Sequence, residues 1–154
     1  MTALHRLARL RPPWLHLLAL PPGQSPQTIL DPPATFAVRT IDGRACSTKQ
    51  RWLLEAARVL SFPNYFDPNW DAFEDCLCDL EWLQAEGYLL LVDQADALLG
   101  AEPGERSTLF SILRSAGTYW SSQRPPKPFR TILVGNDPAG SIAQAHHIPK
   151  WKSA

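Results

Sequence analysis

Two unbroken apolar runs of strand length, YLLLV at 88–92 and TILV at 131–134, are prominent along the chain. Runs of this kind are typical of parallel strands that helices cover on both faces. The segment TFAVRTID at 35–42 precedes them and can form a first strand. The pattern therefore predicts three strands, well separated along the sequence.

The segment after the first predicted strand has the periodicity of an amphipathic helix. Its apolar stripe consists of Leu53, Ala56, Ala57 and Leu60. Ser47 followed by Gln50 has the spacing of a capping box, which predicts where the helix begins. Pro63 disfavours helical geometry in the residue before it, so the helix must end ahead of that proline.

A second helix is predicted to begin at about Asn69, because asparagine commonly caps helix N-termini. A helical projection places one set of apolar side chains on the inner face: Phe73, Cys76, Leu77 and Leu80. The acids fall on the opposite face: Asp71, Glu74, Asp75 and Asp79. Three of these aspartates would lie one turn apart, and like charges at that spacing cost an isolated helix a few tenths of a kcal/mol per pair.

A third helix is predicted over 104–120, with a stripe of Leu109, Ile112, Leu113 and Ala116. The resulting order is strand, helix, helix, strand, helix, strand. This order indicates an α/β fold with a three-stranded, mainly parallel sheet packed by helices. A chain of 154 residues that is 45% apolar can bury the core of one such domain.

The two ends of the chain differ from this central region. Residues 1–33 are predicted to form an N-terminal extension, in which WLHLLAL at 14–20 suggests an extra strand and five prolines at 21–33 suggest a linker. The compact domain is expected over 34–136. Residues 137–154 carry Pro138, Gly140 and Pro149 without a clear periodic element, so they are predicted to be a C-terminal tail.

Charge is strongly segregated, although the formal net charge is zero. Residues 59–105 hold eleven acidic side chains and not one Lys or Arg, whereas the segments on either side are basic. The zero net charge argues against non-specific binding to nucleic acid, and no segment is long enough to span a membrane. The acidic block instead favours a partner that supplies positive charge.

Cysteine and histidine usage argues against a disulfide framework and a metal site. The cysteines are three in number, Cys46, Cys76 and Cys78, and the last two diverge on a helix. His146 and His147 are adjacent and far from any cysteine in sequence, so they have no ligand pattern. No cofactor is expected, and a reducing, cytoplasmic location is predicted.

The stretch FPNYFDPNWDAFEDCL at 62–77 resembles the signature of the barstar family of intracellular ribonuclease inhibitors. The matching features are a proline, an aromatic pair, and then the run Asn, apolar, Asp, Ala, with a second Asp four residues after the first. Here they are Pro63, Tyr65, Phe66, Asn69, Trp70, Asp71, Ala72 and Asp75. The similarity in element order extends over about 36–134, and it implies the family's three-stranded parallel sheet packed by helices.

The resemblance implies a partner-binding surface on the acidic helix and the loop before it. The residues that match contact positions are Tyr65, Asn69, Asp71 and Asp75, and Glu74 is included in the predicted site although its residue type differs from the family's. Asp75 corresponds to the carboxylate that enters the phosphate site of the ribonuclease, where Arg, Lys and His can hold it by charge-assisted hydrogen bonds. Two of these residues also have structural explanations. The role of helix N-cap alone would account for Asn69, and a carboxylate at Asp71 stabilises the first helical turn. Phe66 is expected in the core and Tyr65 at the rim of the surface.

Three positions depart from the family pattern. Asp67 stands where the family usually has glycine. Glu74 occupies a position held by tryptophan in the protein that gives the family its name, and Ser115 aligns near a glutamate that contributes to the interface. These differences predict a different or more weakly bound ribonuclease rather than a lost function.

Three functions are therefore considered. The first is an inhibitor that is monomeric when free and forms a 1:1 complex with a small basic ribonuclease of the barnase type. The second is a barstar-like binding module whose partner is not a ribonuclease. The third is an enzyme that holds a divalent metal with clustered carboxylates for phosphoryl transfer. The sequence contains neither a P-loop nor a glycine fingerprint for nucleotides, which disfavours the third.

Overall fold

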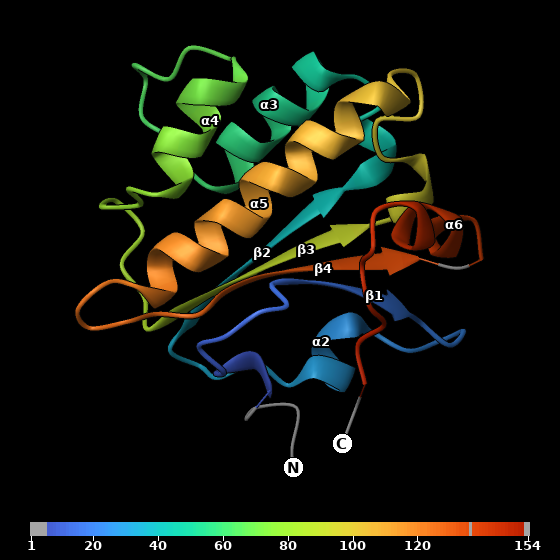
Figure 1. Cartoon of the computed structure of the whole chain (residues 1–154), viewed down its shortest axis with the longest axis horizontal. Helices are drawn as coiled ribbons and strands as arrows, with labels where there is room; N and C mark the ends of the chain where they lie inside the picture. The colour runs from blue at the N-terminus through green and yellow to red at the C-terminus, as the bar shows by residue number, and fades with distance from the viewer. Residues whose placement is uncertain (1–5, 136, 153–154) are drawn as a thin grey trace.

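A four-stranded, fully parallel sheet forms the centre of the protein (Figure 1). The computed structural model describes residues 6–135 and 137–152. The strands are β1 (Leu15–Ala19), β2 (Phe36–Asp42), β3 (Gly87–Asp93) and β4 (Phe129–Gly135), in the spatial order β1-β4-β3-β2. The predicted strands β2, β3 and β4 are confirmed, but the prediction of a three-stranded sheet is wrong.

The additional strand is β1, which comes from the N-terminal extension and pairs in parallel with β4. Leu15, Leu17 and Leu18 are buried, so both faces of this short strand contribute to the core. Pairing also satisfies the backbone groups along the edge of β4, which would otherwise be unpaired. The sequence-based boundary near Ala34 therefore separates two segments that share one sheet.

Helices cover the two faces of the sheet unequally. The helices α3 (Lys49–Val59), α4 (Trp70–Leu77) and α5 (Arg106–Ser121) lie on one face, and the short helix α2 (Pro26–Leu30) lies on the other (Figure 1). This arrangement follows from right-handed crossovers, because β2 to β3 to β4 moves in one direction across the sheet and β1 to β2 moves in the opposite direction. No helix in the described part of the chain is long and apolar enough to cross a bilayer.

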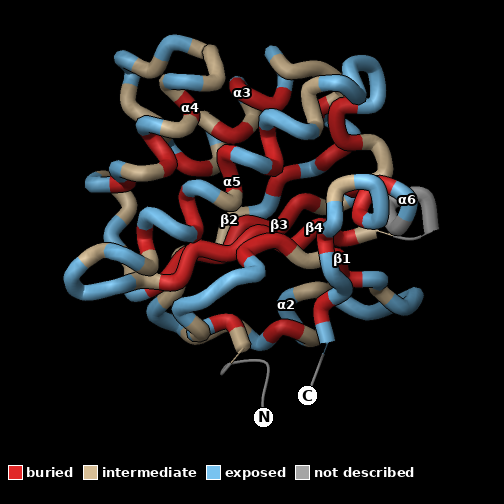
Figure 2. The backbone as a smooth tube through the Cα atoms, viewed as in Figure 1, coloured by how far each residue is buried: buried red, intermediate tan, exposed pale blue. Residues whose placement is uncertain are grey.

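The central strands β3 and β4 are buried on both faces, as their apolar runs predicted (Figure 2). A large core under α3, α4 and α5 contains the predicted stripe residues Leu53, Ala56, Leu109 and Leu113, whereas Ala57 is only half-buried. A smaller core lies on the α2 face and includes Leu7, Leu30, Leu89, Ile132 and Trp151.

The helix boundaries differ in detail from the prediction. Thr48, not Ser47, caps α3, because its hydroxyl accepts a hydrogen bond from the amide of Arg51 (3.2 Å). The helix ends at Val59, ahead of Pro63 as expected. The segment predicted as a proline linker contains α2, whose N-cap is Ser25.

Residues 137–152 of the predicted C-terminal tail contain a helix and a bridge to β1, regular elements that the sequence pattern did not indicate. The segment forms α6 (Asp137–Ala145), and then returns along β1, where Leu17 pairs with Lys150. The amide of Trp151 donates to the carbonyl of Leu17 (2.8 Å), and the indole of Trp151 is buried. Because this segment contains one glycine and two prolines, its sequence pattern did not indicate α6, which packs against β1 and β4.

A substitution at Gly117 of α5 tests whether the N-terminal extension is part of the fold. A Cβ atom at this position would overlap the indole ring of Trp14, which is buried just before β1. We expect Gly117→Val to lower the free energy of unfolding by about 1–3 kcal/mol because of overpacking. Urea unfolding followed by circular dichroism measures the change.

Gly104 provides the control, because a Cβ there would meet no atom within 4 Å. Gly104→Val should change the free energy of unfolding by no more than about 0.5 kcal/mol. Equal effects of the two substitutions would contradict the packing of Trp14 on α5.

Candidate partner-binding surface

The side-chain amide of Asn69 forms two hydrogen bonds at the start of α4. Asn69 Oδ1 accepts a hydrogen bond from the amide of Ala72 (2.8 Å), and its Nδ2 donates to the carboxylate of Asp67 (3.3 Å). The predicted N-cap is therefore confirmed. Because these bonds occupy the Asn69 side chain, its contribution to the surface is to fix the direction in which α4 leaves the loop.

Trp70 connects the start of α4 to the neighbouring helices. Its Nε1 donates to the carboxylate of Glu105 (3.0 Å), immediately before α5, and Lys49 Nζ lies 5.6 Å from the centre of its ring. At the other end of α4, Trp120 Nε1 of α5 donates to the carbonyl of Leu77 (2.8 Å). Both ends of the short helix are thus held against α5, a feature the sequence pattern did not indicate.

The loop before α4 is built on packed aromatic rings. Phe62 lies edge-to-face with Phe66 (ring centres 5.0 Å apart) and also contacts Phe73 of α4 (6.2 Å). Phe66 is partly buried against the core, and Tyr65 points outward with 73% of its surface exposed. The core role of Phe66 and the outer position of Tyr65 agree with the sequence-based expectations.

Asp67 does not require the backbone freedom of glycine. The described non-glycine residues with positive φ include Ser61 and Leu80, on either side of this region, but not Asp67. The replacement of the family's glycine by Asp67 therefore adds no backbone strain. Its carboxylate instead accepts the hydrogen bond from Asn69 and supports the cap.

The amphipathic division of α4 is confirmed by burial. Phe73, Cys76, Leu77 and Leu80 are buried, whereas Asp71 and Asp75 are exposed and Glu74 is half-buried. The prediction fails for Asp79, because α4 ends at Leu77 and Cys78 acts as its C-cap. Asp79 therefore lies beyond the helix, and its Oδ1 accepts a hydrogen bond from the amide of Glu81 (3.3 Å).

The carboxylates of α4 have no cationic partner among the described residues. The ion pairs among the described residues join Arg44 to Asp42 and Arg58 to Glu55, and neither pair involves the acidic block from 59 to 105. The negative charges also act on Cys78. Burial, followed by the charges of Glu74 and Asp75, raises the pKa of its thiol to about 11.

The exposed face of α5 is polar but carries few charges. Ser115 is exposed on it, in a shallow groove that is also lined by Ser107, Ser111, Arg114 and Thr118. The predicted departure at Ser115 therefore leaves a hydroxyl, not a carboxylate, on the exposed face of α5. Over the described ranges, no three His, Cys, Asp or Glu side chains are grouped so that they could hold a metal ion.

The sequence-predicted residues come from two consecutive segments of the chain, and Tyr65, Asp71 and Asp75 are exposed. Tyr65 and Asn69 come from the loop, and Asp71, Glu74 and Asp75 come from α4. Such a surface offers several carboxylates on a rigid helix, with an exposed aromatic side chain nearby. It can form charge-assisted hydrogen bonds with a basic partner.

A family model agrees with this assignment. The model described as Barstar (barnase inhibitor) matches residues 36–134, which include β2, α3, α4, β3, α5 and nearly all of β4. No curated protein matches the chain. The matched range is more than half of the chain and contains the whole candidate surface, so this protein belongs to the barstar family.

Proposed function

We propose that this protein inhibits a small, basic, barnase-like ribonuclease by covering the active site of the enzyme with α4 and the preceding loop. The observation that carries the proposal is the set of exposed carboxylates on α4 that lack a cationic partner among the described residues. The family description, which names barnase inhibition, supports the same partner class.

The chemistry of the partner explains why carboxylates serve this purpose. An enzyme that cleaves RNA must present cationic groups to phosphate, and a carboxylate can occupy the same site through charge-assisted hydrogen bonds. Asp75 lies on the exposed face of α4, one turn after Asp71, in a helix fixed at both ends by Trp70 and Trp120. The helix therefore presents these carboxylates with little loss of conformational freedom on binding.

The proposal includes a 1:1 complex, a monomeric free protein and a cytoplasmic location. The three cysteines are free, which is compatible with a reducing compartment. Asp67, Glu74 and Ser115 keep a second candidate open, namely a barstar-like module whose partner is not a ribonuclease. Glu74 adds a charge, and Ser115 removes one, relative to the family pattern.

The decisive experiment titrates the purified protein into barnase and similar small ribonucleases and follows RNA cleavage. Stoichiometric loss of cleavage, with a 1:1 complex by light scattering, is expected for at least one of them. Inhibition of none would favour the second candidate. RNA or nucleotide hydrolysis by the purified protein alone would instead support the metal-dependent enzyme.

Asp75→Ala should weaken inhibition strongly. We expect a loss of about 2–5 kcal/mol in binding free energy, the range for truncating one partner of a buried interfacial charge pair, which derives in part from barnase and barstar themselves. Inhibition constants from initial rates of RNA cleavage measure the loss. Glu86→Ala is the matched control, because the exposed Glu86 lies just before β3, outside α4 and the loop that precedes it, and it should cost less than about 1 kcal/mol. Equal inhibition by Asp75→Ala and the parent protein would refute the proposed contact.

The association rate should depend strongly on salt. The acidic block from 59 to 105 attracts a basic enzyme over distances comparable with the Debye length, which is about 10 Å at 0.1 M ionic strength. Stopped-flow mixing at low and high ionic strength should show a slower association at high salt, with a much smaller change in the dissociation rate. A salt-independent association rate would be incompatible with electrostatic attraction by this surface.

A further inference from the structure

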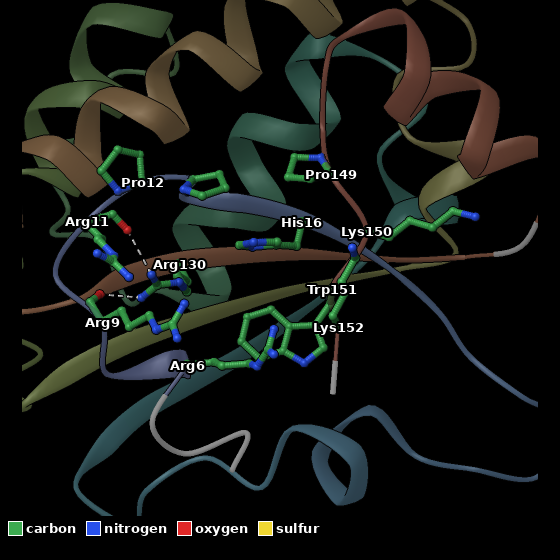
Figure 3. A pocket seen from close by; sticks show the side chains of 11 residues that line it. Arg6, Arg9, Arg11, Pro12, His16, Arg130, Pro149, Lys150, Trp151 and Lys152 are labelled. Carbon is green, nitrogen blue, oxygen red and sulfur yellow. Dashed lines mark hydrogen bonds between the residues drawn. The ribbon is translucent and has the colours of Figure 1, made fainter. Parts of the chain in front are cut away.

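A basic pocket lies where the N-terminal and C-terminal segments meet β1 and β4 (Figure 3). Its volume is about 240 Å³. The cationic residues that line it are Arg6, Arg9, Arg11, Arg130, Lys150 and Lys152. Among its described lining residues there is no Asp or Glu, so the pocket concentrates positive charge.

Arg130 forms the buried wall of the pocket. It lies on β4 with 3% of its surface exposed, and the Cζ atom of its planar guanidinium group lies 5.1 Å from the centre of the Trp14 ring. Its Nη1 donates to the carbonyls of Leu7 (2.9 Å) and Arg9 (2.6 Å), and its Nη2 donates to the carbonyl of Arg11 (3.1 Å). These bonds fix the guanidinium, while its Nε has no hydrogen-bond partner.

Three further polar atoms around the pocket are buried without a hydrogen-bond partner. They are Arg6 Nε, His16 Nδ1 and Trp151 Nε1. His16 lies on β1 opposite Ile132 of β4, two residues from Arg130, and its ring packs edge-to-face on Trp151 (5.0 Å). Unpaired buried polar atoms also occur at Trp14, Trp52 and Thr131, which do not line the pocket, so the indication of a ligand comes from the concentration of cations around this cavity.

The local electrostatics agree with that indication. Burial, followed by the charges of Arg130 and Arg6, lowers the pKa of His16 to about 4, so His16 is neutral at pH 7. Burial, followed by the charge of Arg9, lowers the pKa of Arg130 to about 10. Burial is the larger cause of both shifts, and the charges of the neighbouring arginines act in the same direction, as expected where cations are close together.

We propose that this pocket binds the phosphate group of a small phosphorylated ligand. Side chains that carry N–H donors line the pocket from three segments: Arg6 from the N-terminal segment, Arg130 from β4, and Trp151 from the C-terminal segment (Figure 3). A tetrahedral oxyanion directs its oxygens toward several sides at once, whereas a carboxylate offers two oxygens in one plane. The exposed Lys150 and Lys152 and the half-enclosed shape suit a compact anion more than a polymer.

The pocket is independent of the proposed inhibitor function. Arg130 is the one pocket cation within the family-matched range, and the other five belong to the segments before residue 36 and after residue 134. The phosphate site is therefore an addition carried by the two terminal segments. Failure of ribonuclease inhibition would leave this proposal intact, and loss of phosphate binding would leave the inhibitor proposal intact.

Calorimetric titration of the full chain with inorganic phosphate, at constant ionic strength and near-neutral pH, tests the site. We expect saturable 1:1 binding with a Kd of about 1 mM or tighter. AMP should bind at least as tightly as phosphate, and adenosine should not bind, because it lacks the phosphate group. No saturable binding of phosphate or AMP would overturn the proposal. Binding of an oligonucleotide without terminal phosphates, but not of AMP, would overturn it in favour of an extended nucleic-acid surface.

Substitutions then locate the site without removing the bonds of Arg130. Arg6→Gln should weaken phosphate binding by about tenfold or more, because one charge-assisted donor is lost. Lys150→Gln, at an exposed position, should weaken it by a smaller factor. Arg51→Gln removes the same charge from the exposed side of α3, outside the pocket, and should leave the Kd unchanged. Equal affinities of all three variants would refute binding in this pocket.

Discussion

The burial of β3 and β4 on both faces is the constraint on which the rest of the structure depends. Their apolar side chains alternate between the large core under α3, α4 and α5 and the smaller core on the α2 face. A parallel sheet of this composition is stable only when both faces are covered. The helices α3, α4 and α5 cover one face, so the second face must be covered by the terminal segments, through residues such as Leu7, Leu30 and Trp151.

This constraint also determines what α4 can present to a partner. The helix buries Phe73 and Leu77 in the large core, which turns Asp71 and Asp75 outward. Repulsion between carboxylates one turn apart costs only a few tenths of a kcal/mol, whereas burial of a Phe or Leu side chain contributes about 1.5–3 kcal/mol. Core packing therefore outweighs the repulsion, and the negative surface remains available for a basic partner.

The second face has the opposite chemistry because β4 places Arg130 there. Alternation along the strand directs Phe129 and Leu133 into the large core and Ile132 and Val134 into the smaller one, so Arg130 lies on the α2 face. A buried guanidinium must be hydrogen-bonded, and the carbonyls of the N-terminal segment supply its partners. The protein thus separates an acidic helix surface from a basic pocket on the other side of one sheet.

Features that depend on local patterns could be predicted from the order of the amino acids. The apolar runs gave β3 and β4, the periodic stripes gave the inner faces of α3 and α5, and the motif around Asn69 gave the family and the cap of α4. Only the tertiary structure decided the pairing of β1 with β4, the end of α4 before Asp79, the presence of α6, and the convergence of Arg6, Arg130 and Lys150. These features depend on contacts between residues far apart in the chain, and neither periodicity nor a short motif records which distant segments will pack together.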